Sequence, residues 1–305
     1  MDKVTIITVN YNQPKATIEL LLSIKKHYQN QIEVILVDNA SDENHEIEFN
    51  NAFPDLIFLR SELNLGFAGG NNLGINIANG DYIFLLNNDT EIIAGCIEVL
   101  INEFETNSQI GLLSPLIIYD DDRSMIQYAG YTPLNYLTAR NSQIGQFEKN
   151  VGQYDRLSYE TAFCHGAAVM CKRADLMKAG LMDESYFLYY EELDWCEKFK
   201  RIRKTINFTG KTHIYHKESI SVGKESIIKT YFMTRNRMLF IRRNTGILNT
   251  LLFSIYYTLI AFPKMIFLYL KNSRTDLAKF ALKGLVWNFS HSKNSKDLGF
   301  KLHKL

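Results

Sequence analysis

The sequence predicts an α/β fold with a mostly parallel central sheet, because a short apolar run is followed by a helical pattern four times in roughly the first 100 residues. The clearest run, residues 82–86, is apolar without alternation, which is typical of a strand buried on both faces. It stops at polar residues, as strands do at the ligand-binding edge of open parallel sheets. The expected strands are residues 4–9, 34–37, 56–59 and 82–86.

Length and composition suit one large α/β domain with an appendage. With 305 residues, 46% of them hydrophobic, the chain can fill a sizeable core, which excludes a disordered protein. The first residues lead directly into an expected strand without a cationic, apolar leader, so we expect the chain to act in the cytosol. The four cysteines show neither a CxxC pair nor a zinc-type spacing, and we expect reduced, partly buried thiols.

Charge is distributed unevenly along the chain. Residues 1–195 contain 12 Lys and Arg against 28 Asp and Glu, whereas residues 196–305 contain 22 against 5. The net charge of +1 therefore hides a front part of −16 and a rear part of +17. A basic segment of this size indicates an anionic partner, either nucleic acid or anionic lipid. Mutual neutralisation of the two parts across an internal interface is the alternative.

The first two expected strands end in polar residues. Residues 4–9 run into Asn10, and Pro14 then opens a helical pattern. Residues 34–37 run into Asp38, which begins a polar terminus before an acidic helical segment. Because the carboxyl ends of neighbouring parallel strands meet at one edge, both residues are expected at that edge.

A glycine-rich segment follows the third expected strand. It runs from Asn64 through Gly66, Gly69 and Gly70 to Asn72, and its glycines would let the backbone approach a ligand closely. The helix expected after it would offer its amino end to an anion. The first strand is not followed by GxGxxG, and a P-loop is absent too, so a standard dinucleotide-binding fold is not expected.

The fourth expected strand ends at Asn87, Asn88 and Asp89. We interpret Asp89 as a metal or phosphate site, because a carboxylate at a strand's carboxyl end has access to a ligand. The alternative is a simple turn, since Asn-Asn-Asp-Thr is also good turn and helix-cap chemistry.

The middle of the chain is less regular. Residues 110–159 contain short strand-like pieces at 112–119 and 125–131, separated by polar loops, as in an acceptor-side subsite. Residues 160–173 follow as a turn and a buried strand. We interpret His165 there as an interior histidine rather than a catalytic one.

Residues 186–200 join an aromatic run to an acidic helix start. Glu191 and Asp194 share one helical face, whereas Glu192 points about 100° away. The apolar wall of residues 187–190 would raise the pKa of a carboxyl toward the range useful to a general base. An ordinary acidic helix start, favoured by the helix dipole, is the alternative.

Two short strands are expected at residues 206–208 and 212–215, and the second ends at His216. A histidine at a strand end can complete a site that a carboxylate begins, whereas a surface histidine is the alternative.

The C-terminal part is expected to be helical. Residues 225–244 read as a basic helix, and residues 247–270 are an apolar segment interrupted by Pro263. We expect the apolar segment to form an interfacial or re-entrant helix pair on a membrane, with a buried helical hairpin as the alternative. One more basic amphipathic helix with a Lys/His-rich tail would follow in residues 275–305.

Six motifs of the chain stand in a familiar order. They are TVNYN at 8–12, ILVDNASDE at 35–43, NLGFAGGNNLGI at 64–75, LLNNDTEI at 85–92, FLYYEELDWCEK at 187–198 and the His216-Lys217 strand end. In this order, over about residues 3–220, the chain resembles the family 2 inverting glycosyltransferases, and it looks closest to their bacterial rhamnosyltransferase-like branch. The resemblance implies the GT-A fold, a nucleotide-sugar donor and a single inverting displacement at the anomeric carbon.

The resemblance also implies a donor site. Val9 and Asn10 would border the base, and Asp38 would accept the ring N–H. The nucleoside and diphosphate would be lined by the glycine-rich segment and by the residues before Asp89. The donor-binding residues implied in this way are Asn64, Gly66, Gly70, Asn71, Asn87 and Asn88.

For the chemistry, the resemblance implies a divalent metal ion and a general base. Asn87, Asn88 and Asp89 match the Asp-x-Asp motif, so Asp89 would bind Mg²⁺ or Mn²⁺, and His216 matches a histidine that reaches the metal or diphosphate. Glu192 falls on the base, with Glu191 as its possible substitute and Asp194 beside them. Two positions depart from the pattern: Asn87 stands for the first Asp, and Glu192 stands for an Asp.

The implied organisation is a GT-A domain in residues 1–222 and a membrane-associating extension in residues 223–305. The expected partners are a nucleotide-diphosphate sugar, best guessed as dTDP-rhamnose, a lipid-linked saccharide acceptor, and the anionic inner face of the cell membrane. Nucleic acid is not expected, because a long apolar helix beside the basic residues suits lipid better. A UDP-hexose or UDP-N-acetylhexosamine donor, and a non-catalytic nucleotide-sugar-binding module, are the alternatives.

Overall fold

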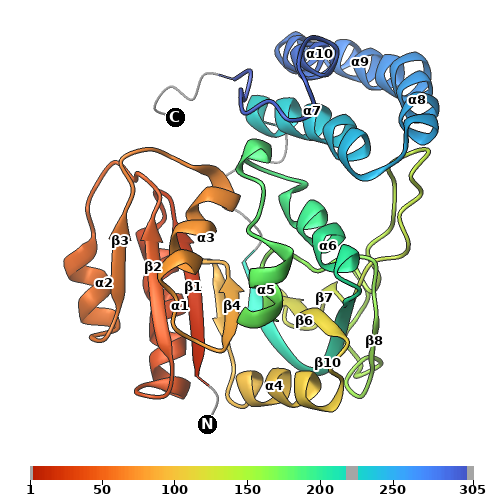
Figure 1. Ribbon diagram of the computed structural model, residues 1–305. Coiled ribbons are helices and arrows are strands. Elements are labelled where there is room, and N and C mark those ends of the chain that lie inside the picture. The colour runs from red at the N-terminus through yellow and green to blue at the C-terminus, as the bar shows by residue number, and fades with distance from the viewer. Residues whose placement is uncertain (1–2, 218–225, 301–305) are drawn as a thin grey trace.

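A ten-stranded sheet forms the centre of the computed structural model, which describes residues 3–217 and 226–300 (Figure 1). Its main path has the strand order β3-β2-β1-β4-β9-β6-β10-β5, with β7 beside β6 and β8 beside β10. The strands are β1 (Val4–Asn10), β2 (Glu33–Asp38), β3 (Ile57–Arg60), β4 (Tyr82–Leu86), β5 (Thr90–Ile92), β6 (Ile110–Tyr119), β7 (Ile126–Tyr128), β8 (Ser158–Glu160), β9 (Ala168–Lys172) and β10 (Thr205–His216).

Strand directions confirm the predicted mostly parallel sheet. β3, β2, β1 and β4 pair in parallel, and β6 pairs in parallel with β10. β9 lies antiparallel between β4 and β6, so β4 and β6 share one direction, whereas β5 is antiparallel at the edge. The carboxyl ends of β1, β2 and β4 therefore meet at one edge, as the strand endings predict.

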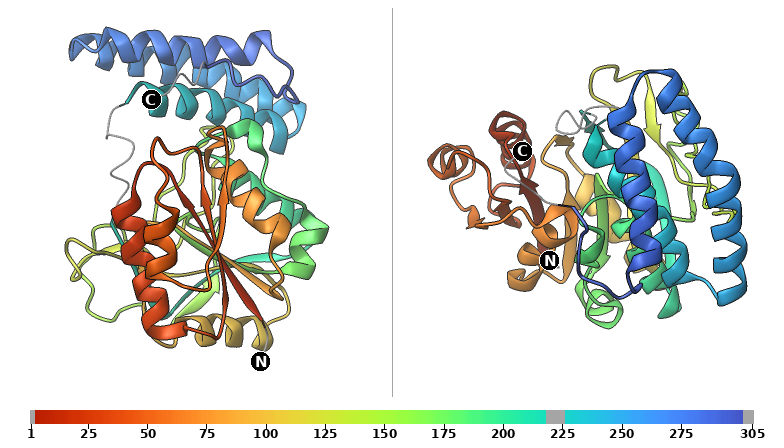
Figure 2. Two further views of the ribbon diagram at one scale, coloured as in Figure 1. Left: turned by 90° about the vertical axis from the view of Figure 1, so that its left-hand side faces the viewer. Right: turned by 90° about the horizontal axis from the view of Figure 1, so that it is seen from above.

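Helices cover both faces of the sheet (Figures 1 and 2). On one face pack α1 (Pro14–Tyr28), α2 (Glu46–Ala52) and α4 (Cys96–Thr106). On the other pack α3 (Gly66–Ile77), α5 (Arg173–Ala179) and α6 (Glu191–Arg201), with a short 3-10 helix, η1 (Glu184–Tyr186), just before α6. Successive strand residues point to opposite faces of the sheet. Ile6 of β1 packs in the first core, under α1, α2 and α4, and Ile7 packs in the second core, under α3, α5 and α6.

The glycine-rich segment is helical rather than a loop. α3 begins at Gly66, so the glycines form its first turns. Gly66 has a φ of +70°, and a Cβ there would lie 2.0 Å from the carbonyl oxygen of Phe187. A Cβ on Gly70 would lie 2.8 Å from Cγ1 of Val9. The glycines therefore let α3 pack closely on the protein's own backbone and on β1.

The two short strands expected at 206–208 and 212–215 are one bulged strand, β10. Its register against β6 shifts between Thr209 and His213. A Cβ on Gly210, inside the bulge, would lie 1.9 Å from the Tyr154 carbonyl oxygen, so only glycine fits this crossing. The strand-like pieces expected at 112–119 and 125–131 correspond to β6 and to the shorter β7.

A helical layer covers the end of the molecule toward which β1, β2 and β4 run (Figure 2). It consists of α7 (Ile227–Asn244), α8 (Ile247–Tyr256), a π-helical turn η2 (Tyr257–Ala261), α9 (Phe262–Lys271) and α10 (Thr275–Ser290). α8, η2 and α9 form one continuous helix, so both the expected helix pair and its hairpin alternative are wrong. Pro263 falls in the first turn of α9, directly after the π-helical turn, where a residue without N–H is tolerated.

α7 packs inward instead of presenting its basic face to the surroundings. Arg235 and Asn236 are 0% exposed, and Met238, Leu239 and Phe240 belong to the second core of the sheet. Arg243 forms an ion pair with Asp183 at 2.8 Å. Part of the basic charge is thus used inside the molecule, and α7 shares a core with the sheet. The boundary expected at residue 222 lies outside the described residues.

Candidate active site

β1 and β2 bring Asn10 and Asp38 together at the sheet edge. The two residues are partners in the strand register, and Asn10 Nδ2 donates to Asp38 Oδ1 at 2.8 Å. Asp38 is buried, and its Oδ2 accepts no hydrogen bond, although Arg60 Nε lies 3.6 Å away. A buried carboxylate oxygen without a hydrogen bond suits the N–H of a ligand, because an unsatisfied buried acceptor costs free energy.

A chain of hydrogen bonds connects Asn10 to the end of β4. Thr17 Oγ1 of α1 donates to Asn10 Oδ1 at 2.9 Å, and Asn88 Nδ2 donates to Thr17 Oγ1 at 3.0 Å. The backbone N–H of Asn87 donates to the carbonyl oxygen of Ala167 at 2.9 Å. Asn87 and Asn88 remain partly exposed beside the buried Asp89. The structure therefore assembles the first, second and fourth strand ends into one polar edge.

Asn39 is a site residue that the sequence analysis missed. Its Nδ2 donates to Asn64 Oδ1 and to the Gly66 carbonyl oxygen, both at 3.1 Å, and its Oδ1 accepts from the Leu65 N–H at 2.9 Å. Asn39 thereby fixes the entry to α3 beside Asp38. The only signal in the sequence is its place directly after Asp38.

Asp89 and His216 face each other, because the pairing of β5 with β10 sets Thr90 opposite His216. Asp89 Oδ1 lies 3.1 Å from His216 Nε2; both atoms are buried, and the contact lacks hydrogen-bond geometry. Gln127 Oε1, also missed from the sequence, lies 2.7 Å from His216 Nδ1 and accepts its proton. Nε2 of the same ring is thereby directed toward the Asp89 carboxylate.

This pair fits a divalent cation. A carboxylate oxygen and an imidazole nitrogen are both common metal ligands, and the hydrogen bond with Gln127 fixes the orientation of the histidine ring. The described residues hold no cluster of three or more His, Cys, Asp or Glu side chains suited to a metal. Mg²⁺ is commonly held by one or two protein groups together with substrate phosphates and water, so two ligands suffice for a shared site.

The second part of the site is the pair Glu191 and Glu192 at the start of α6. An Oε2 atom of each is buried and accepts no hydrogen bond. Burial, and then the charge of Glu192, raise the pKa of Glu191 well above its ordinary value. Burial also raises the pKa of Glu192, against backbone N–H groups at the helix start that stabilise its charged form. The pKa values of both carboxyls are thus raised, which is the direction that favours a general base.

The backbone that delivers this pair is unusual. Phe187, Tyr189 and Tyr190 have φ values of 64°, 68° and 76°. Residues other than glycine rarely adopt this region, and they keep it only where their surroundings hold them. Tyr190 is the residue that precedes the first turn of α6, so these angles set the direction in which Glu191 and Glu192 leave the segment.

A row of aromatic rings joins the two parts of the site. His216 and His165 have ring centroids 5.9 Å apart, His165 and Tyr128 are 5.3 Å apart, and Tyr128 and Tyr131 are 5.3 Å apart. Burial, followed by the charge of Glu192, raises the pKa of Tyr131, so this ring lies near the base. Burial, followed by His216, lowers the pKa of His165 to about 3, which keeps this interior histidine neutral.

Two expected site residues also make hydrogen bonds within the protein. Asp194 is buried and accepts hydrogen bonds from Tyr186 Oη at 3.1 Å and Asn244 Nδ2 at 2.8 Å, so it ties α6 to α7. Asn71 is buried, and its Nδ2 donates to the Phe67 carbonyl oxygen of its own helix at 2.9 Å. Val9 and Gly70 contact each other where α3 crosses β1.

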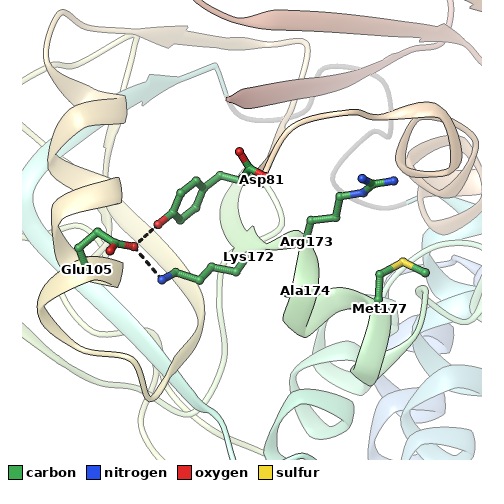
Figure 3. A pocket seen from close by; sticks show the side chains of 7 residues that line it. Asp81, Glu105, Lys172, Arg173, Ala174 and Met177 are labelled. Atoms are coloured by element: carbon green, nitrogen blue, oxygen red, sulfur yellow. Dashed lines mark hydrogen bonds and ion pairs between the residues drawn. The ribbon is translucent and has the colours of Figure 1, made fainter. Parts of the chain in front are cut away.

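An open pocket of about 640 Å³ lies at the opposite end of β4 (Figure 3). Glu105 in its wall accepts from Tyr82 Oη at 2.5 Å and from Lys172 Nζ at 2.7 Å. The pocket adjoins Asp81 and Tyr82, where β4 begins, whereas Asp89 follows the end of that strand. It is therefore separate from the site described above.

Solved structures identify the fold class of the chain. Over 86% of this chain and 57% of the other, the fold matches GalNAc-T7 with UDP, GalNAc and Mn²⁺, at a TM-score of 0.61 and 15% identity. Over 94% of this chain and 87% of the other, it matches a mannosyltransferase from Pyrobaculum calidifontis in complex with GDP-Man and Mn²⁺, at 0.57 and 12%. The fold is that of the GT-A transferases, and both neighbours contain a divalent metal.

The chain belongs to glycosyl transferase family 2, whose model matches residues 5–180. Among curated relatives, a low-salt glycan biosynthesis hexosyltransferase of Haloferax volcanii, Agl10, is 26% identical over 78% of this chain and 75% of its own length. The N-acetylglucosaminyl-diphospho-decaprenol L-rhamnosyltransferase of Mycobacterium tuberculosis is 21% identical over 73% of this chain and 79% of its own length. The predicted family is confirmed, and the chain is a glycosyltransferase of glycan or polysaccharide synthesis.

Proposed function

We propose that the chain is an inverting, metal-dependent glycosyltransferase that moves a sugar from a nucleotide-diphosphate donor to a hydroxyl group of a growing, lipid-linked cell-surface saccharide. The observation that carries this proposal is the convergence of the buried Asp89 carboxylate and the His216 ring, 3.1 Å apart, with a buried glutamate pair in the same molecule. Each of these buried groups lacks the partner that donor, metal and acceptor would supply.

Glu192 acts as the general base. The acceptor O–H proton passes to its carboxylate while the acceptor oxygen bonds to the anomeric carbon, and the bond from that carbon to the phosphate oxygen breaks. The electron pair of the broken bond leaves with the nucleoside diphosphate, and the anomeric configuration inverts. A base with a raised pKa holds the proton better during attack. Burial and the charge of Glu192 raise the pKa of the neighbouring Glu191, which favours the protonated form of Glu191 and avoids a second negative charge beside the aromatic residues.

Asp89 and His216 would hold a Mg²⁺ or Mn²⁺ ion beside the donor diphosphate. When bound, the ion neutralises the charge that develops on the leaving phosphates. Asp38 and Asn10 receive the nucleobase through the free Oδ2 of Asp38, and Asn64 with the start of α3 lies beside the nucleoside. Asn87 and Asn88 remain partly exposed along the diphosphate path.

The donor that we favour is dTDP-rhamnose, with a UDP-hexose or UDP-N-acetylhexosamine as the second candidate. The mycobacterial relative, named a rhamnosyltransferase, favours the first, and the haloarchaeal hexosyltransferase favours the second. The mycobacterial relative's name also includes a diphospho-decaprenol acceptor, which supports a lipid-linked saccharide here.

We also place the chain at the inner face of the cell membrane. The helix Ile247–Lys271 is long and apolar enough to cross a membrane, with a mean hydropathy of 1.7 and only 17% of its apolar window buried. It packs on α7 and α10, and its outward side chains include Leu251, Leu259 and Phe267 at 55%, 69% and 65% exposure. A helix held along the domain suits binding in the plane of the interface. Flotation with anionic vesicles should recover the chain, and Leu251→Glu with Leu259→Glu should abolish recovery; equal recovery would exclude this placement.

A thermal-shift panel of nucleotide sugars with and without Mn²⁺ tests the function. Because a ligand that binds only the folded state raises the melting temperature, one donor should stabilise the chain only together with Mn²⁺. That donor should also release its nucleoside diphosphate slowly in water, which a non-catalytic binding module would not do. A panel without any metal-dependent shift would contradict the proposal.

A further inference from the structure

One side chain from a distant helix donates hydrogen bonds to the segment that precedes α6. Asn236 of α7 is 0% exposed, and its Nδ2 donates to the carbonyl oxygens of Tyr186 at 2.9 Å, Leu188 at 2.8 Å and Tyr189 at 2.8 Å. All of these bonds go to the turn that directly precedes Glu191 and Glu192. The backbone angles of that turn are the unfavourable ones, so it depends on such outside contacts.

Arg235 fixes the orientation of the Asn236 amide. Its Nη1 donates to Asn236 Oδ1 at 2.6 Å, which leaves Nδ2 as the atom that faces the carbonyl oxygens. Its Nη2 donates to the Ser185 carbonyl oxygen at 2.9 Å, one residue before the turn. The Arg235 guanidinium lies 4.1 Å from the centre of the Trp287 ring of α10, so the arrangement is anchored on two helices.

A third residue of α7 reaches the same turn. Arg237 Nε donates to Tyr190 Oη at 3.0 Å, and Tyr190 caps the start of α6. Three consecutive residues of α7 thus contact residues 185–190 through side-chain donors. The apolar contacts that attach α7 to the core come from other positions, such as Met238 and Phe240.

We propose that Asn236 is a positioning residue for catalysis: it holds residues 187–190 in the conformation that directs Glu191 and Glu192 toward the acceptor. The inference rests on the proposed role of these glutamates. Because a displacement of about 1 Å can cost about 100-fold in rate, loss of this clamp should lower kcat strongly. Donor binding depends on the strand ends, so the KM for the donor should change little.

The test compares the full chain with Asn236→Ala, Asn236→Ser and the control Asn288→Ala. Asn288 lies buried in the same helical layer, where its Nδ2 donates to the carbonyl oxygens of Arg235 at 3.0 Å and Gly284 at 3.1 Å, not to residues 187–190. With Mn²⁺ and dTDP-rhamnose or UDP-glucose, release of nucleoside diphosphate gives kcat and KM. We expect kcat to fall about 100-fold in Asn236→Ala, less in Asn236→Ser, which keeps one donor, and within about threefold in the control.

A folded Asn236→Ala protein with the kcat of the control, or one whose donor KM rises in step with the loss of rate, overturns the proposal. A different variant tests the proposed function: if Glu192 is not the base, Glu192→Gln retains its kcat, whatever the result for Asn236→Ala. If neither sugar is turned over, infrared titration of the buried carboxyls decides. Loosening the turn should admit water and lower their midpoint by about one pH unit in Asn236→Ala alone, and an unchanged midpoint overturns the proposal.

Discussion

The two parts of the site are built in different ways. The strand-end part, with Asp38, Asp89 and His216, is fixed by strand register, since each residue lies at or directly beyond the end of a strand. The glutamate part, Glu191 and Glu192, follows a turn with unfavourable backbone angles that is bound by Asn236, between 47 and 50 residues later in the chain. The first part is set by strand pairing across the sheet, whereas the second depends on side-chain contacts with α7.

The two parts also differ in what their unpaired atoms lack. Asp89 and His216 bring a carboxylate oxygen and a ring nitrogen within 3.1 Å of each other, an arrangement that suits a shared cation. Glu191 and Glu192 are two acids whose neighbouring charges disfavour double ionisation, which a proton satisfies. Under the proposed function the first part would hold a metal ion and the second would accept a proton, and variants can separate the two roles.

The largest effect is expected from Glu192→Gln. Removal of a general base costs about 10²–10⁴-fold in rate, and the amide keeps the size of the side chain. The rate of sugar transfer should fall by that factor while metal-dependent donor binding, measured by calorimetry, persists. Glu197→Gln is the matched control, because Glu197 lies on the same helix and contacts Lys200 at 2.9 Å. Near-normal turnover of Glu192→Gln would exclude Glu192 as the general base. Loss of donor binding in this variant would show that the glutamate part also binds the donor.

The strand-end part could be predicted from the sequence better than the glutamate part, because strand endings are visible in the sequence and tertiary side-chain contacts are not. The order of apolar runs and their polar endings predicts the parallel strands, because strand and edge are local patterns. Thus Asn10 and Asp38 lie together at the sheet edge, and Asp89 contacts His216 at the end of β10. Gln127 and Asn39 were not predicted as site residues, because a hydrogen bond to a distant ring or loop leaves no periodic pattern in the sequence.

The helical layer shows the limits of pattern. The basic residues of α7 predict an outward face, yet Arg235 points inward, because backbone carbonyl oxygens and the Trp287 ring replace an anionic partner. Pro263 predicts a break between two helices, but a π-helical turn absorbs it. Asp194 reads like a third catalytic acid, and only the tertiary contact with Asn244 shows its structural use.

A smaller effect is expected from Asp89→Ala, which removes one of two protein ligands in the strand-end part. Because even residues that support metal ligands typically contribute 10–100-fold to affinity, Mn²⁺-dependent donor binding should weaken by at least about 100-fold. Titration of the donor with and without chelator measures it, with Asp120→Asn as the control, a carboxylate paired with Arg123. Donor affinity that is the same with and without chelator would refute the metal assignment. The pH midpoint of the glutamates should not move.

The smallest effect concerns stability, and it isolates the glutamate part without any substrate. The folded-state pKa of Glu191 is raised by burial and by Glu192. Between the ordinary glutamate pKa and this raised value, the folded chain keeps a proton that the unfolded chain has released, so stability falls as pH rises through that window. The slope is at most about 1.4 kcal/mol per pH unit for one group. Glu191→Gln should flatten this decline in denaturant unfolding, whereas Glu46→Gln, at an exposed position of α2, should leave it unchanged. Transfer activity should rise with pH over the same window, because the base must lose its proton. If the stability of Glu191→Gln falls with pH as steeply as that of the unmodified chain, the two glutamates are not coupled.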